Sequence, residues 1–398
     1  MKPNLRHLRV FLAVADHGSI TRAAEIGLVS QPAVTQAVAK LERAAEARLF
    51  DRTPRGLFPT EAGAALAHRV RRAFALLDPA LDAVAPRLRL TATASQLEAL
   101  IALRETENST LAARRLGIAQ PTVHRAVTQI EHEAGRSLFE RSPRGMLATR
   151  PARALARAAR LAFAELDQAA ADLAELGGRE VGRIVVGAMP LSRSSVLPRA
   201  IARFRRVRPT LPILIHDGPY DELLTGLRRG EIDMLIGALR DPAPVADVEQ
   251  RELFRDDLVL VAGRDHPLAA ATAITTAELA RYPWIVARSE TPTRRHFDRL
   301  FEGGPAPASI VESGSVILMR ELLGSSDHLG CASRLQALVE AGRGAMTILP
   351  FAMPGTARPI GLTLRADWLP TRAQRDFLDL LRPETHSREA VGRPATRG

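Results

Sequence analysis

Two short stretches of this sequence place hydrogen-bonding side chains at the start of a helix. The first runs from Ser30 to Gln36, and a near copy, from Ala119 to Arg125, begins 89 positions later (119 − 30 = 89). A serine followed by Gln-Pro is typical of a helix N-terminus, since serine caps the helix and proline in the first turn loses no hydrogen bond. The polar residues of the first stretch lie outside the apolar face of the helix, which begins at Val34. Side chains of this kind can bond to base edges in the major groove of DNA.

Both stretches belong to a longer internal repeat. About 28 of the 71 positions from Leu8 to Asp78 match the residue 89 positions downstream, without a gap. Each copy is predicted to contain an amphipathic helix, a short helix, the helix described above, a basic turn and a long linker helix. Two helices joined by a tight turn and followed by a basic turn are typical of a winged helix-turn-helix. The sequence therefore predicts a duplicated all-α winged domain.

Composition favours an anionic partner in a reducing compartment. The 398 residues carry a net charge of +11, almost all of the positive charge as arginine, and the sequence pI is about 11.0. Cys331 is the only cysteine, so no disulfide can form within the chain. The N-terminus has no signal-peptide pattern, and no apolar run is long enough to span a membrane. We expect a cytoplasmic protein.

The remainder of the chain has a different pattern. Apolar strand-like runs alternate with helices from residue 179 onward, which predicts βαβ units, a largely parallel sheet and two α/β lobes, with the chain crossing back between them near Leu349. The sequence contains no paired carboxylates, no metal-spaced cysteines and histidines, no phosphate-binding loop and no nucleophile elbow. We therefore expect no enzyme activity, no cofactor and no metal.

The N-terminal copy resembles the DNA-binding domain of the LysR-type transcriptional regulators. The motifs that carry the resemblance are AAE, SQPAV, LE, LFDR and TEAG, in this order between residues 23 and 63. The resemblance implies that one set of residues enters the major groove and that two wing arginines reach phosphates. The groove residues are Ser30, Gln31, Pro32, Thr35 and Gln36, and the wing residues are Arg52 and Arg55.

The second copy departs from the first at the positions that would touch bases. Ala119 replaces the capping serine, and His124 and Arg125 replace Thr35 and Gln36, so this copy would read different bases, with Arg125 able to pair with guanine. A typical family member has one such domain, which leaves two readings, a second DNA-binding head or a spacer and dimerisation module. We favour DNA binding because the exposed positions became more basic. The candidate contacts are Gln120, Pro121, His124, Arg125, Arg141 and Arg144.

The C-terminal region resembles the family's effector-binding domain, whose two lobes are similar to periplasmic binding proteins. The phrases GRIVVGAMP, GEIDMLIGAL and DDLVLVAGRDHPLA carry this match, and the tail from Thr356 to Leu378 is similar to galactose-binding and protocatechuate-pathway regulators. The resemblance implies an effector in the cleft between the lobes, an anionic intermediate of aromatic catabolism or a sugar, held near helix N-termini. The candidate residues are Ser192, Ser194, Ser195, Ser289, Thr291, Ser313 and Ser315; capping and loop roles are the alternative for each.

Together these patterns predict a transcriptional regulator whose promoter binding responds to a small molecule. The expected domains are residues 1–88, 89–178 and 179–385, with a disordered tail at 386–398. Linker helices would pair two chains into a homodimer or homotetramer, and heads on a two-fold oligomer predict a palindromic operator. The alternative is a solute-binding protein without a DNA role. The salt dependence of DNA binding distinguishes the regulator from the solute-binding protein, because the affinity of a protein for DNA falls steeply as the salt concentration rises.

Overall fold

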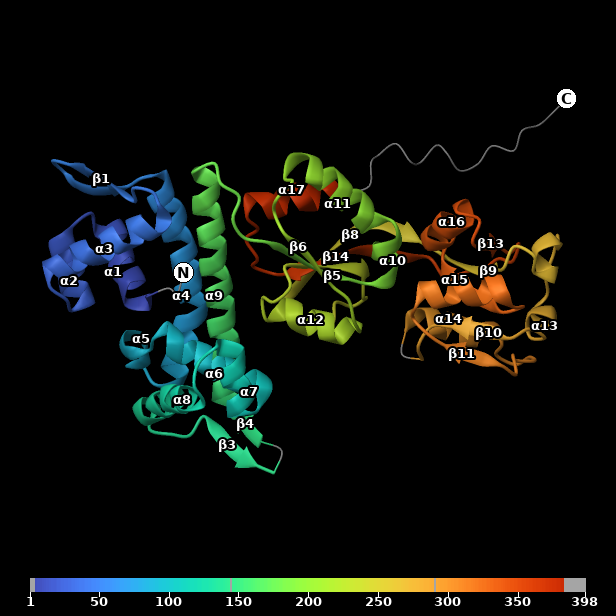
Figure 1. The fold of residues 1–398 in the computed structure, drawn as a ribbon, viewed down its shortest axis with the longest axis horizontal. Helices are drawn as coiled ribbons and strands as arrows, with labels where there is room; N and C mark the ends of the chain where they lie inside the picture. The colour runs from blue at the N-terminus through green and yellow to red at the C-terminus, as the bar shows by residue number, and fades with distance from the viewer. Residues whose placement is uncertain (1–3, 144, 290, 383–398) are drawn as a thin grey trace. The chain divides into compact units, whose positions relative to one another are not determined.

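The computed structural model describes residues 4–143, 145–289 and 291–382, and its chain divides into two compact units (Figure 1). The first comprises Met1–Arg183 with Arg229–Glu231, and the second comprises Ile184–Arg228 with Ile232–Gly398. The predicted tail at 386–398 lies outside the described residues. Among the helices that are described, none is both long enough and apolar enough to cross a membrane.

The first winged head consists of three helices and a two-stranded wing, followed by a linker helix. Ser30 caps the third helix, as predicted, and Ser19 and Thr60 cap the second helix and the linker helix. Gly18 ends the first helix in the left-handed conformation, with φ of 64°. The elements are α1 (Leu5–His17), α2 (Ile20–Gly27), α3 (Gln31–Ala45), β1 (Phe50–Thr53), β2 (Gly56–Pro59) and the linker helix α4 (Glu61–Val84).

The second winged head repeats this order after one extra helical turn. Asn108 caps its second helix. Ala119 forms no side-chain cap on the third helix, because alanine has no side-chain acceptor. The elements are α5 (Leu88–Thr91), α6 (Ala94–Thr106), α7 (Ser109–Leu116), α8 (Gln120–Ala134), β3 (Phe139–Ser142), β4 (Gly145–Ala148) and the linker helix α9 (Arg150–Leu176).

The two linker helices pack side by side in one chain (Figure 1). They run antiparallel, since Arg69 contacts Gln168 while Arg72, further along α4, contacts Glu165, which comes earlier in α9. Their apolar faces belong to one continuous core, which also includes the first helices of both heads. We expected linker helices to pair between two chains. The structure pairs α4 with α9 of the same chain, because the duplication supplies both halves of the helix pair.

The second unit is an α/β structure of two lobes, as predicted. The sheet of lobe 1 has the strand order β6-β5-β7-β14-β8, with α11 and α17 packed on one face and α12 on the other. The elements are β5 (Ile184–Ala188), α10 (Pro190–Ser194), α11 (Val196–Val207), β6 (Ile213–His216), α12 (Tyr220–Arg228), β7 (Met234–Ala238), β8 (Val248–Asp256), β14 (Arg358–Arg365) and α17 (Arg372–Leu380).

Lobe 2 repeats this architecture with the strand order β11-β10-β12-β9-β13. Trp284 is fully buried on one face of its sheet, 5.0 Å from the ring of Phe297 and 5.7 Å from that of Phe301. The elements are β9 (Leu258–Ala262), η1 (Pro267–Ala270), α13 (Thr276–Leu279), β10 (Trp284–Val286), α14 (Pro292–Leu300), β11 (Ile310–Glu312), α15 (Val316–Ser325), β12 (Leu329–Ser333), α16 (Arg334–Gly342) and β13 (Thr347–Ile348).

Both sheets are largely parallel, as predicted, but each contains one antiparallel strand, which the sequence did not predict. In lobe 1, β5 pairs parallel with β6 and β7, whereas β14 pairs antiparallel with β7 and β8. In lobe 2, β9 is antiparallel to β12 and β13. The chain enters lobe 2 at β9 and returns to lobe 1 at β14. A strand that arrives from the other lobe has no βαβ crossover to impose a parallel direction. The return after Leu349 was predicted correctly.

Candidate nucleic-acid interface

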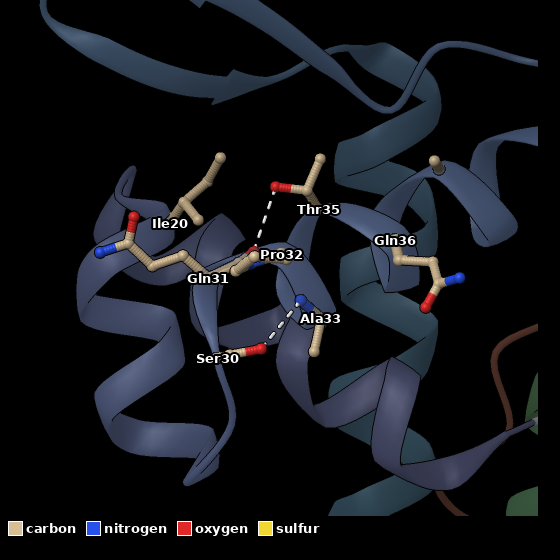
Figure 2. Close-up of a pocket in the computed structure, with 8 residues that line it drawn as sticks. Ile20, Ser30, Gln31, Pro32, Ala33, Thr35 and Gln36 are labelled. Carbon is tan, nitrogen blue, oxygen red and sulfur yellow. Dashed lines mark hydrogen bonds between the residues drawn. The ribbon is translucent and has the colours of Figure 1, made fainter.

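The first turn of α3 presents the candidate base-reading side chains. Ser30 Oγ accepts a hydrogen bond from the amide of Ala33 at 3.4 Å, and Thr35 Oγ1 donates to the carbonyl of Gln31 at 3.2 Å. Gln31 and Gln36 are exposed and extend to opposite sides of a shallow hollow formed by this turn (Figure 2). The arrangement leaves two amide groups and the methyl group of Thr35 free to meet base edges.

Packing on the opposite face of α3 holds that turn outward. Val34, Ala37 and Leu41 are buried against α1 and α2, where Ala23 and Ala24 allow close approach. Ser30, Pro32, Thr35 and Gln36 are exposed like Gln31, so all five predicted groove residues lie on the exposed surface of α3 and its cap. The spacing of the apolar residues along α3 is enough to separate its buried face from its exposed face.

The wing is anchored to the end of α1. Gly56 has φ of 130°, and a Cβ atom at this position would lie 2.6 Å from the carbonyl oxygen of Gly18. The amide of Leu57 donates to the same oxygen at 2.9 Å. Arg52 and Arg55 are exposed and form no ion pair within the described part of the chain. They are therefore available to phosphate groups.

The second head presents an equivalent surface with different chemistry. Gln120, Pro121, His124 and Arg125 are exposed, and Gln120 Nε2 donates to Ser109 Oγ at 3.2 Å. The ring of His124 lies 3.5 Å from Thr128 Oγ1. The exposed wing residue Arg141 matches Arg52 of the first head, and Arg144 lies outside the described residues. The two heads thus carry unlike side chains on a shared scaffold.

The candidate effector residues of lobe 1 are engaged inside the protein. Ser192 is fully buried and its Oγ donates to the carbonyl of Met189 at 2.7 Å, while Ser195 is also buried. Ser194 Oγ accepts a hydrogen bond from Gln336 Nε2 at 3.1 Å. Since Gln336 belongs to α16 of lobe 2, this hydrogen bond joins the two lobes. All three serines follow the carboxyl end of β5, where ligands bind in open α/β sheets.

The candidate effector residues of lobe 2 lie at the starts of helices. Thr291 caps α14 by accepting a hydrogen bond from the amide of Arg294 at 3.2 Å, and Ser315 caps α15. Ser313 Oγ accepts a hydrogen bond from the amide of Ser315, and Ser289 is exposed. Capping, the alternative that the sequence left open, is therefore an observed role of Thr291 and Ser315.

Sequence reasoning missed a positively charged group where the chain returns to lobe 1. Arg358 begins β14, and its Nη1 donates to Thr293 Oγ1 at the start of α14 at 3.0 Å. Its Nε is buried and has no hydrogen-bond partner in the described part of the chain. Burial, and then the positive charges of Arg299, Arg358 and Arg295, lower the pKa of His296. No local pattern marks this group, because Arg358 and Thr293 are 65 positions apart.

Fold and surface together define a winged-helix regulator with a two-lobed ligand-binding domain. The family model described as "Bacterial regulatory helix-turn-helix protein, lysR family" matches this chain twice, at residues 5–64 and 94–153. The model of the "LysR substrate binding domain" matches residues 177–385. The chain belongs to the LysR family and is a DNA-binding transcriptional regulator with an effector domain, not an enzyme.

Similar proteins share this assignment. The transcriptional regulator GalR of Pseudomonas putida is 36% identical over 376 residues, which covers 93% of this chain and 94% of that protein. PcaQ of Agrobacterium fabrum is 27% identical over 278 residues, or 69% of this chain and 89% of its own length. A full-length OxyR variant from Pseudomonas aeruginosa has the same fold, with a TM-score of 0.53 and 24% identity, covering 72% of this chain and 93% of that chain. The matched models thus pair a regulatory helix-turn-helix domain with a substrate-binding domain.

Proposed function

We propose that both winged heads read bases, so that the operator consists of two unlike half-sites. One observation carries this proposal: α3 and α8 expose the same surface, yet Thr35 and Gln36 of the first head are replaced by His124 and Arg125 in the second. A head that had become only a spacer would have no need of an exposed arginine facing the groove. The operator is then composite, in place of the palindrome expected for identical heads.

Each proposed contact follows from side-chain chemistry. Gln36 suits an adenine, which an amide can bond bidentately, and Thr35 suits the methyl group of thymine. Arg125 suits the N7 and O6 atoms of guanine. The exposed guanidinium groups of the wings neutralise phosphates and set the register of each head without reading sequence. DNA as the partner also supports a cytoplasmic location.

Footprinting on DNA upstream of the gene tests the proposal. We expect Thr35→Ala/Gln36→Ala to remove protection from one half-site and His124→Ala/Arg125→Ala to remove it from the other, since each head loses only its own base contacts. His132→Ala, on an exposed position of α8 about two turns beyond His124, is a matched control that should leave both half-sites protected. An unchanged footprint for the second double variant would make the second head a spacer.

We further infer that the effector carries a negative charge. The guanidinium of Arg358 lies between the lobes and is largely removed from water. The positive charge of Arg240 lowers the pKa of Arg358, and the positive charge of Arg358 lowers the pKa of His296. Burial lowers the pKa of Arg358, and the carboxylate of Asp256 offsets this only in part, so an anion that pairs with Arg358 relieves a remaining cost. Closure around that anion acts on the Ser194–Gln336 hydrogen bond, which already joins the lobes.

Thermal shift measurements separate the two effector classes that the sequence left open. We expect an aromatic carboxylate such as benzoate to raise the melting temperature of the second unit, and galactose to leave it unchanged. In Arg358→Met the carboxylate effect should disappear, whereas Arg255→Met, on an exposed position of β8, should retain it. Stabilisation by galactose that persists in Arg358→Met would instead indicate a neutral effector.

A further inference from the structure

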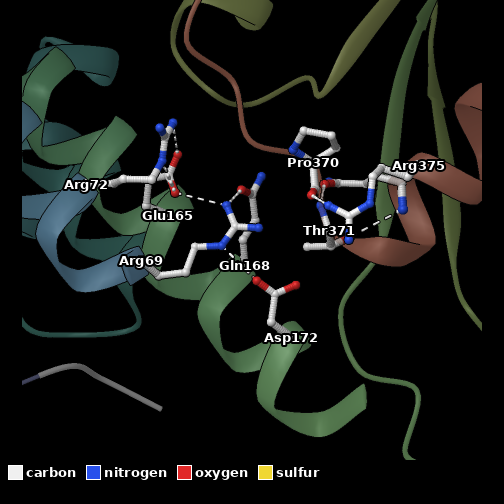
Figure 3. Close-up of polar contacts among 9 residues, drawn as sticks. Arg69, Arg72, Glu165, Gln168, Asp172, Pro370, Thr371 and Arg375 are labelled. Atoms are coloured by element: carbon white, nitrogen blue, oxygen red, sulfur yellow. Dashed lines mark hydrogen bonds and ion pairs between the residues drawn. The ribbon is translucent and has the colours of Figure 1, made fainter. Parts of the chain in front are cut away.

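A buried ionic network crosses between the two linker helices (Figure 3). Arg69 of α4 is only 2% exposed, and its Nη1 donates to Glu165 Oε2 at 3.0 Å and to Gln168 Oε1 at 2.9 Å. Its Nε donates to Asp172 at 2.8 Å. Arg72 adds two hydrogen bonds to Glu165, at 3.2 and 3.1 Å. In these five hydrogen bonds both cations come from α4 and all three acceptors come from α9.

The internal repeat shows that this division is not shared by the two copies. Positions 89 residues apart are equivalent, and in α9 the equivalents of Arg69 and Arg72 are Ala158 and Leu161. In α4 the equivalents of the three acceptors are also apolar. Glu165, Gln168 and Asp172 correspond to Leu76, Pro79 and Ala83. The arginines of the network therefore occur only on α4, and its acceptors occur only on α9.

Pairs of identical helices cannot form this network. An α4–α4 pair of the same geometry would bury Arg69 from both chains opposite Leu76, Pro79 and Ala83. An α9–α9 pair would bury Glu165 from both chains opposite Ala158 and Leu161. A buried charge without its partner is far more costly than a buried pair is favourable, so both alternatives are penalised.

We propose that this network selects the α4–α9 pair within one chain, so that the partner of the first head is the second head of the same molecule. Two further contacts support a head at each end of the helix pair. Arg136, after α8, donates to the carbonyl of Ala83 at 2.6 Å, and Arg179, after α9, pairs with Glu46 at the end of α3 at 2.7 Å. The inference goes beyond DNA reading and holds whether or not the second head contacts bases.

Cross-linking of the full-length protein tests this pairing. A short bis-maleimide should bridge Glu46→Cys/Arg179→Cys within single chains, at a yield independent of protein concentration. Both positions are exposed, whereas native Cys331 is buried, which raises the pKa of its thiol to about 12 and keeps it unreactive. A covalent dimer as the main product would overturn the proposal. So would the absence of a bridge when both thiols react with a single-headed maleimide.

A second cysteine pair reports the competing arrangement. In an α4–α4 dimer, Leu90 of the partner subunit would occupy the place of Arg179 (90 + 89 = 179), so Glu46→Cys/Leu90→Cys would form covalent dimers. We expect none with the native network. In the background Arg69→Leu/Glu165→Leu, which removes the main buried charges, we expect these dimers to increase at least several-fold. Dimers in the native background, or no increase without the network, would each contradict selection by the network.

Discussion

Replacing Arg69 with leucine is expected to lower the free energy of unfolding of the N-terminal unit by about 3 kcal/mol. The substitution leaves the carboxylate of Glu165 buried with only Arg72 beside it, and it leaves Gln168 and Asp172 without their shared donor. For a unit of this size, a loss of about 3 kcal/mol corresponds to a fall of roughly 6–12 °C in its melting temperature. Differential scanning calorimetry of the full-length protein would measure the shift in the transition of this unit.

Two companion variants make the result specific to the network. Adding Glu165→Leu should restore most of the lost stability, because the two leucines replace the two most buried charges of the network. A double-mutant cycle gives the coupling energy between residues 69 and 165. Arg71→Leu removes an exposed arginine from the same helix and should change stability by less than about 1 kcal/mol. Equal losses for Arg69→Leu and Arg71→Leu would show that the buried network contributes no more than a surface ion pair.

The second large effect concerns base specificity. Thr35→His/Gln36→Arg gives the first head the reading residues of the second, and we expect it to bind the native operator about 100-fold more weakly. Two base contacts are changed, each worth about 1–3 kcal/mol, and about 1.4 kcal/mol corresponds to a factor of ten. Affinity should recover on an operator in which the second half-site replaces the first. Fluorescence anisotropy at fixed salt would measure both affinities.

The scaffold supports this exchange, because the surrounding residues are already shared. Gln31 and Pro32 match Gln120 and Pro121, and both wings are anchored by a glycine against the end of the head's first helix. Arg52→Ala is the matched control: it removes a phosphate contact and should weaken binding to both operators equally. If the exchanged variant also loses affinity equally on both operators, residues 35 and 36 do not read bases.

Local sequence was sufficient for each winged head. The caps at Ser19 and Ser30, the exposed first turn of α3 and the missing cap at Ala119 depend on neighbours within one helical turn, so residue type and spacing define them. The repeat of 89 residues likewise identified the second head and the positions where the two heads differ. The family assignment followed from motifs within these same segments.

Contacts between distant segments required the tertiary structure. The choice between pairing within a chain and pairing between chains depends on which side chains meet across two helices, and Arg69 lies 96 positions from Glu165. The mixed sheets of the second unit arise where β9 and β14 cross between lobes, and the charged group at Arg358 forms only when β14 meets α14. Sequence alone determined what each head presents to DNA, because helix periodicity is local. Tertiary structure decided which side chains meet between α4 and α9, because burial of a charge is stable only where its partner lies opposite.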